Sequence, residues 1–135
     1  MPDPIRTLGV HHFRLTVSDV DRTCAFYTGV LGFRKVMDLQ PGAFLTNGSV
    51  GLGIGPSPDP GRRGKGDRFD ENRVGLDHMS FGVTSRQDLK DAVKVLEAHG
   101  VEHSEIRDLG EAFGICILVF RDPDNIQLEL SAPSK

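Results

Sequence analysis

The chain has 135 residues, of which 38% are apolar and 26% are charged, and its formal net charge at pH 7 is -3. A mildly acidic chain without a basic run is poorly suited to binding nucleic acid or a membrane surface. No apolar stretch approaches the roughly 20 residues that span a bilayer. The N-terminus has no apolar signal region, and Cys24 and Cys116 lack a CxxC spacing. The sequence therefore predicts a cytoplasmic protein with two reduced thiols.

Residues 9–17 predict the first strand, because apolar and polar side chains alternate along them. Side chains on a strand point to alternate faces. The face expected to pack under a helix carries Phe13, Leu15 and Val17. The opposite, uncovered face carries His12, Arg14 and Thr16. This strand therefore presents an imidazole, a guanidinium and a hydroxyl in one row.

A helix and three strands are predicted to follow. Ser18 with Asp21 resembles a capping box, which favours a helix over about 20–31. The predicted strands cover residues 33–38, 43–46 and 50–54, with a hairpin turn at Asn47-Gly48. Glycine alternates with apolar residues in the last of these strands, so one of its faces has no side chains. Glycines in strands often mark the close approach of a ligand or another backbone.

Residues 56–73 have the composition of a loop, with repeated Pro and Gly among charged side chains. We interpret this stretch as a linker. Its charged part, residues 61–73, suits either a solvated connection or a lid over a site.

The same order of elements then returns. Residues 76–83 repeat the alternation of the first strand, and His78 lies 66 residues after His12 (78 − 12). Ser85 and Asp88 form a second capping-box pattern before a helix that is expected to end near Gly100. Three further strands are predicted, a short one within 101–109 and two longer ones at 115–120 and 126–131. In the last strand Gln127, Glu129 and Ser131 share the uncovered face.

This pattern predicts an α+β fold made of two paired βαβββ modules. The modules are expected to form a curved mixed sheet with the helices on its outer face. We expect one domain over residues 1–135. Module one covers about 8–55, the linker 56–73, and module two about 74–132.

The uncovered face collects His12, His78 and Glu129 from three strands. Two imidazoles and a carboxylate suit a divalent metal with positions left open for water or substrate. No short spacing enforces this grouping, so each residue could instead be an ordinary exposed or hydrogen-bonded strand residue. His12 and His78 hold the same position in the two repeats, which favours the metal interpretation. His11, His99 and His103 are interpreted as structural or surface residues.

At these residues the sequence resembles the vicinal oxygen chelate superfamily, also called the glyoxalase/bleomycin resistance protein/dioxygenase family. Three motifs carry the resemblance, and together they cover nearly the whole chain. They are His12-x-x-Leu15-x-Val17 continuing to Leu31-Gly32-Phe33, Asp77-His78-x-x-Phe81-x-Val83, and Phe120-x-Asp122-Pro123-Asp124 leading to Leu128-Glu129-Leu130.

The resemblance implies a metal site formed by His12, His78 and Glu129. The metal would be Fe, Zn, Mn, Ni or Co. It also implies a homodimer in which one subunit supplies the first-strand ligand and its partner supplies the others. The strand 50–54 lacks the glutamate ligand of glyoxalase I-like members, and residues 109–120 lack the histidine of extradiol dioxygenases. These departures argue against both of those specific reactions.

The resemblance still implies a metal-dependent enzyme with lyase- or dioxygenase-type chemistry on a small substrate with vicinal oxygens, its specific reaction unassigned. Glu129 and Arg14 are the candidate catalytic residues. Arg14 could pair with an anionic group, or it could form a cross-strand salt bridge. Thr16, Ser80, Gln127 and Ser131 are candidate supporting donors. The alternative is a metal-free protein that sequesters a small molecule or antibiotic, of the bleomycin resistance type.

Overall fold

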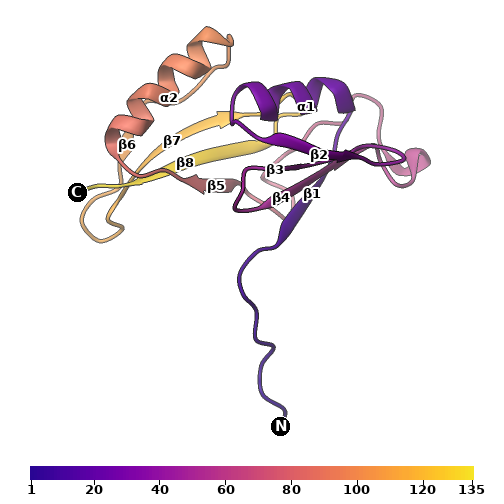
Figure 1. The fold of residues 1–135 in the computed structure, drawn as a ribbon, viewed down its shortest axis with the longest axis horizontal. Coiled ribbons are helices and arrows are strands. Elements are labelled where there is room, and N and C mark those ends of the chain that lie inside the picture. The colour runs from indigo at the N-terminus through magenta and orange to yellow at the C-terminus, as the bar shows by residue number, and fades with distance from the viewer. The chain divides into compact units, whose positions relative to one another are not determined.

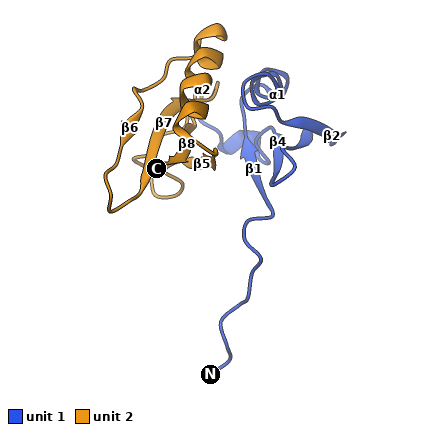
Figure 2. Ribbon diagram, turned by 60° about the vertical axis from the view of Figure 1, so that its left-hand side comes forward, with its two compact units in different colours: residues 1–64 blue, residues 65–135 orange.

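The computed structural model describes residues 1–135 and shows two compact units, Met1–Gly64 and Lys65–Lys135 (Figure 2). Each unit contains one α-helix and four strands (Figure 1). The boundary between the units falls inside the predicted linker 56–73, so the second half of that stretch belongs to the second unit.

The first unit has the predicted βαβββ order. Its elements are β1 (His12–Thr16), α1 (Val20–Gly29), β2 (Arg34–Asp38), β3 (Ala43–Thr46) and β4 (Gly51–Gly55), followed by a short 3-10 turn at Pro60–Arg62. The strands form one mixed sheet in the order β1-β4-β3-β2. β1 and β4 run parallel, and the remaining neighbours run antiparallel.

The cap of α1 differs from the sequence prediction. Asp19, and not Ser18, is the N-cap, and its carboxylate accepts a hydrogen bond from the backbone N–H of Arg22 at 3.1 Å. The Ser18 hydroxyl instead accepts a hydrogen bond from the Arg22 guanidinium. Two good capping residues stand side by side here, and the carboxylate takes the cap because it is the one that reaches the N3 amide.

The core of the first unit lies between α1 and its sheet. Tyr27 of α1 is fully buried, as are Leu45 of β3 and Ile54 of β4. Leu15 and Val17 are buried while His12, Arg14 and Thr16 are exposed. The predicted alternation of β1 is therefore confirmed, although the strand begins at His12 rather than at residue 9.

The second unit repeats this arrangement. Its elements are β5 (Met79–Gly82), α2 (Arg86–Ala98), β6 (Arg107–Asp108), β7 (Ile115–Arg121) and β8 (Gln127–Pro133). The sheet order is β5-β8-β7-β6, with β5 and β8 parallel. Ser85 and Asp88 form the predicted capping box at the start of α2.

The helix-facing side of this second sheet is apolar. Leu89 and Leu96 of α2 are buried with Leu118, Leu128 and Leu130 of the sheet. Along β8, buried residues alternate with half-buried Gln127, Glu129 and Ser131, as predicted. Both cysteines are free, and Cys116 is fully buried in β7.

The segment before β5 is tied to the turn between β7 and β8. The Arg121 guanidinium forms two hydrogen bonds with the Glu71 carboxylate, at 2.9 and 2.8 Å. These bonds lower the pKa of Glu71 to about 2. The Phe69 amide donates to the Asp124 carbonyl, and the Asn125 side chain donates to the Phe69 carbonyl. Residues 69–71 are thus held at this hairpin.

The two units correspond strand for strand, which confirms the predicted α+β fold of two βαβββ modules. The Val17 amide donates to the Gly55 carbonyl at 2.9 Å, and the Val83 amide donates to the Ser131 carbonyl at 2.8 Å. Val17 and Val83 are 66 residues apart, as are His12 and His78.

Neither α1 nor α2 combines the length and the apolar character that a membrane-spanning helix needs.

Candidate functional site

The helix-free face of the second sheet brings two predicted ligands together. His78 directly precedes β5, and Glu129 lies on the neighbouring strand β8, opposite Ser80. The His78 Nε2 atom lies 3.6 Å from Glu129 Oε2. The His78 side chain is 40% exposed, whereas the Glu129 side chain is 12% exposed. One open imidazole nitrogen therefore faces a largely covered carboxylate.

Asp77 fixes the orientation of this imidazole. The Nδ1–H of His78 donates to Asp77 Oδ1 at 2.7 Å, and in the neutral imidazole this places the lone pair on Nε2. Gln127 holds Asp77 in turn, because its side-chain amide donates to Asp77 Oδ1 at 2.9 Å and to the Asp77 carbonyl at 3.2 Å. Carboxylates that hold a histidine in this way are typical neighbours of metal-binding imidazoles.

Ser131 holds Glu129, and Ser80 in turn contacts Ser131. The Ser131 hydroxyl donates to Glu129 Oε1 at 3.1 Å and is itself hydrogen-bonded to Ser80. Across β7, Val119 pairs with Glu129 and Ile117 pairs with Ser131. Three of the predicted supporting donors, Ser80, Gln127 and Ser131, thus connect to His78 or Glu129 through hydrogen bonds.

His12 lies on the corresponding face of the first unit. Its Nδ1 atom lies 2.8 Å from Nδ1 of His11, so one of the two imidazoles donates a hydrogen bond to the other. The His12 ring also meets the ring of Phe44 edge-on, with 6.2 Å between ring centroids. The sequence predicts a structural or surface role for His11, and the structure places this residue in direct contact with a predicted ligand.

Arg14 covers the glycine face of β4. In the parallel pair of β1 with β4, His12, Arg14 and Thr16 oppose Gly51, Gly53 and Gly55. A Cβ on Gly53 would lie 3.4 Å from Arg14 Nη1, and one on Gly55 would overlap the guanidinium. Arg14 makes no ion pair, so the predicted alternative of a cross-strand salt bridge is not observed. The glycine face of β4 is therefore covered by the Arg14 side chain.

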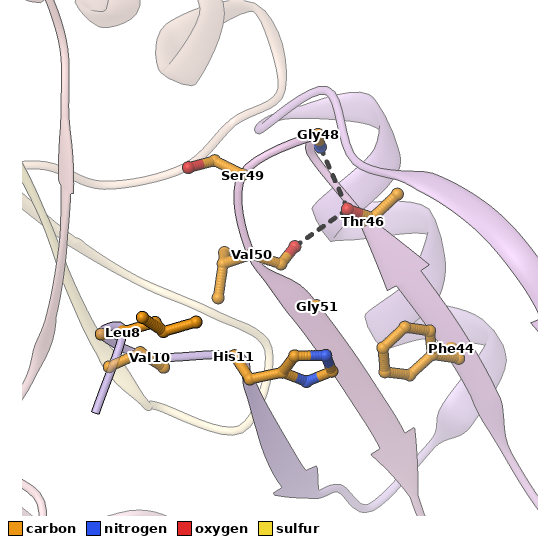
Figure 3. A pocket seen from close by; sticks show the side chains of 10 residues that line it. Leu8, Val10, His11, Phe44, Thr46, Gly48, Ser49, Val50 and Gly51 are labelled. Atoms are coloured by element: carbon orange, nitrogen blue, oxygen red, sulfur yellow. Dashed lines mark hydrogen bonds between the residues drawn. The ribbon is translucent and has the colours of Figure 1, made fainter. Parts of the chain in front are cut away.

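A shallow depression of about 360 Å³ lies at the start of β1 (Figure 3). Its walls are mainly apolar, and they include Val10, Phe44 and Val50, with His11 as the ionisable member. The Thr46 hydroxyl donates to the Val50 carbonyl and accepts from the Gly48 amide, which fixes the β3–β4 turn at the rim. The depression adjoins Gly51, the residue paired with His12.

The predicted ligands are thus found in both units, with His78 and Glu129 in contact in the second and His12 in the first. No group of three or more His, Cys, Asp or Glu side chains is arranged so that it could hold a metal ion. The other two histidines, His99 and His103, have local partners. His99 Nδ1 contacts the Val95 carbonyl. His103 contacts the Ser104 carbonyl and Glu97, and these contacts raise the pKa of the His103 imidazole.

Comparison with known proteins gives a consistent result. The family model of the Glyoxalase/Bleomycin resistance protein/Dioxygenase superfamily matches residues 9–130. The uncharacterized protein YwkD of Bacillus subtilis (strain 168) is 31% identical over 128 residues, which is 90% of this chain and 94% of YwkD. The crystal structure of a glyoxylase/bleomycin resistance protein/dioxygenase domain from Frankia sp. EAN1pec is 32% identical, with a TM-score of 0.81. The match covers 96% of this chain and 95% of the Frankia domain.

A more distant structure has the same fold. FosX, a fosfomycin resistance protein from Listeria monocytogenes, was crystallised as a mutant with Mn(II) and 1S,2S-dihydroxypropylphosphonic acid. FosX is 19% identical to this chain, with a TM-score of 0.72. The match covers 96% of this chain and 93% of the FosX chain.

Proposed function

Because the chain belongs to the glyoxalase/bleomycin resistance protein/dioxygenase superfamily, we propose that it is a metal-dependent enzyme acting on a small substrate with two adjacent oxygens. The reaction is of the lyase or dioxygenase type. His12, His78 and Glu129 bind one divalent metal, which is Fe, Zn, Mn, Ni or Co.

The observation that carries this proposal is the pair of His78 and Glu129. The Asp77 contact leaves His78 Nε2 as a lone-pair donor, and this atom is 3.6 Å from a carboxylate oxygen held by Ser131. A neutral imidazole and a carboxylate held in these orientations fit two ligands of a divalent metal. They also leave further coordination positions to other donors.

His12 supplies the third donor in this proposal. It occupies the position in module one that His78 occupies in module two, and its Nδ1 also contacts the residue that precedes it. If His12 donates from Nδ1 to His11, its Nε2 carries the lone pair, as in His78. The two imidazoles and one carboxylate are a donor set that first-row divalent metals accept.

The metal would act as a Lewis acid on the chelated oxygens of the substrate. Within the chain, Asp77 keeps the His78 proton on Nδ1, and Ser131 keeps Glu129 turned toward His78. Arg14 presents a cation on the same face of β1 as His12. Glu129 and Arg14 are the residues proposed to act directly in catalysis.

We place the site in a homodimer, with His12 from one subunit and the other two ligands from its partner. The FosX mutant, which has the same fold, was crystallised with both Mn(II) and a small vicinal diol, and this supports a metal-binding role for the fold.

Elemental analysis of untagged protein, purified without chelators, tests the metal site. We expect about one divalent metal per chain in the wild type. His78→Ala should lose it, because one of three ligands is removed, and Glu129→Gln should lose tight binding because a neutral amide replaces the carboxylate. His99→Ala is the matched control, since its imidazole contacts the Val95 carbonyl of its own helix.

The outcome separates the two functions considered for this fold. Metal lost in His78→Ala and Glu129→Gln but kept in His99→Ala supports the enzyme. A wild type that takes up no metal, even after anaerobic reconstitution, would favour sequestration of a small molecule. Full occupancy in Glu129→Gln would remove Glu129 from the ligand set.

A further inference from the structure

The two modules differ at the position of the carboxylate ligand. Strand β8 pairs with β5 as β4 pairs with β1, and the amides of Val83 and Val17 anchor the two registers at Ser131 and Gly55. In module one, Arg14 of β1 pairs with Gly53 of β4. At the corresponding positions of module two, Ser80 of β5 pairs with Glu129 of β8. Module one thus has an arginine and a glycine where module two has a serine and a glutamate.

The Arg14 side chain fills the vacated space. Its aliphatic part and Nη1 lie over Gly53, with Nη1 3.4 Å and Cγ 3.5 Å from the place a Cβ would take. The guanidinium extends over Gly55, where any Cβ would collide with it. Gly53 and Gly55 have no side chains on the open face of β4, and they therefore leave room for the guanidinium there.

This guanidinium has no anionic partner within the chain. Arg14 makes no hydrogen bond or ion pair, in contrast to Arg121, which binds Glu71 through two hydrogen bonds. A guanidinium presents several N–H donors in a plane that suits a carboxylate or phosphonate. An arginine that lies over two glycines without a counter-ion is therefore available to an anionic group of a ligand.

From this exchange we infer that the site selects organic acids, with Arg14 binding a carboxylate or phosphonate next to the chelating oxygen of the substrate. The inference rests on the proposed metal site and names its substrate class. With two neutral histidines and one glutamate, a divalent metal keeps one positive charge, and Arg14 adds a second. An anionic substrate supplies the negative charge that a carboxylate at position 53 would have provided.

The test compares glycolate with glycolamide, which share a hydroxyl next to a carbonyl carbon but differ in charge. Binding of both to Mn(II)-loaded and metal-free protein is measured by calorimetry and by ligand-observed NMR. We expect the loaded wild type to bind glycolate at least about tenfold more tightly than glycolamide. Arg14→Ser should keep its metal content and lose most of this preference. Arg107→Ser, an exposed arginine on β6, is the control and should keep it.

A double variant tests the correspondence itself. Arg14→Ser combined with Gly53→Glu recreates in module one the serine and glutamate of module two. We expect tighter metal binding and no preference for glycolate. Circular dichroism checks that each variant is folded, and Arg14→Ser alone decides the inference if the double variant does not fold.

The outcomes distinguish this inference from the proposed function. A metal-loaded wild type that binds both probes equally, or an Arg14→Ser protein that keeps the preference, would overturn the inference and leave the metal site in place. A wild type without metal would contradict the proposed function. The metal-free titration then decides the inference alone: glycolate binding lost in Arg14→Ser supports it, and no binding overturns it.

Discussion

Gly42 occupies a position that suits no other residue. Its φ of +108° lies in the region that glycine alone adopts readily, and a Cβ there would collide with the backbone carbonyl oxygen of Ile54. The collision is with backbone, so no side chain can turn away to relieve it. Gly42 thereby lets β3 begin directly beside the end of β4.

We therefore expect Gly42→Ala to destabilise the protein by roughly 2–3 kcal/mol. Urea unfolding followed by circular dichroism measures the difference. Gly64→Ala is the matched control, because Gly64 is exposed with open space where its Cβ would be. Its stability should be unchanged or raised by up to about 1 kcal/mol. Equal stability of the two variants would contradict the steric argument.

At the scale of elements, the segment 69–71 and the β7–β8 hairpin form one unit through Glu71 and Arg121. The pKa of Glu71 is lowered from 4.5 to about 2 in the folded chain, chiefly by its hydrogen bonds to Arg121. A carboxyl whose pKa falls on folding stabilises the folded state above its unfolded pKa. This contribution is lost as the pH falls from about 4.5 toward 2.

Glu71→Gln should consequently be less stable than the wild type at pH 7, and the difference should vanish near pH 2. Unfolding by urea at pH 7, 4 and 2.5 gives the comparison. Glu102→Gln, at an exposed position, should show no such pH-dependent difference. If the Glu71→Gln difference is constant from pH 7 to 2.5, the ion pair does not act through the Glu71 carboxylate.

Elements with their own local signals were predictable from the sequence. Ser85 and Asp88 formed the predicted capping box, and the alternation along β1 and β8 correctly separated buried from open faces. The cap of α1 was assigned one residue early because Ser18 and Asp19 both suit the position, and only the backbone decides between them. The contact of Glu71 with the β7–β8 hairpin could not be predicted, because its partner Arg121 lies 50 residues further along the chain.

In the candidate site too, some features have a local sequence signal and others do not. Period-two alternation placed His12, Arg14 and Glu129 on open faces without further information. The roles of His11 and Asp77 could not be predicted, because alternation assigns them to the opposite face from the histidines that follow. Their contacts arise where the chain enters β1 and β5, before regular pleating begins. The sequence was thus enough to predict on which face each proposed ligand lies. It was not enough to predict which residues form hydrogen bonds with these ligands.

At the scale of the whole molecule, the internal repeat divides the proposed ligands between the two units. A single chain of 14.8 kDa carries His12 in one unit and His78 with Glu129 in the other. The homodimer prediction implies that each metal site takes His12 from one subunit and the remaining ligands from its partner. Such sharing has a consequence that a site within one chain lacks, because two defective chains can complement each other.

Mixing His12→Ala with His78→Ala chains tests this sharing. Each variant alone should bind no metal, since every site lacks one histidine. In a mixed dimer, the His78→Ala chain supplies His12 and the His12→Ala chain supplies His78 and Glu129, which restores one site. Equal mixing with free subunit exchange makes half of the dimers mixed, so we expect about a quarter of a metal ion per chain. Analytical ultracentrifugation establishes the dimer, and elemental analysis gives the metal content.

A mixture of His78→Ala with Glu129→Gln is the control and should stay empty, because both changes remove ligands from the same unit. A dimer that recovers no metal in the first mixture would place all three ligands within one chain.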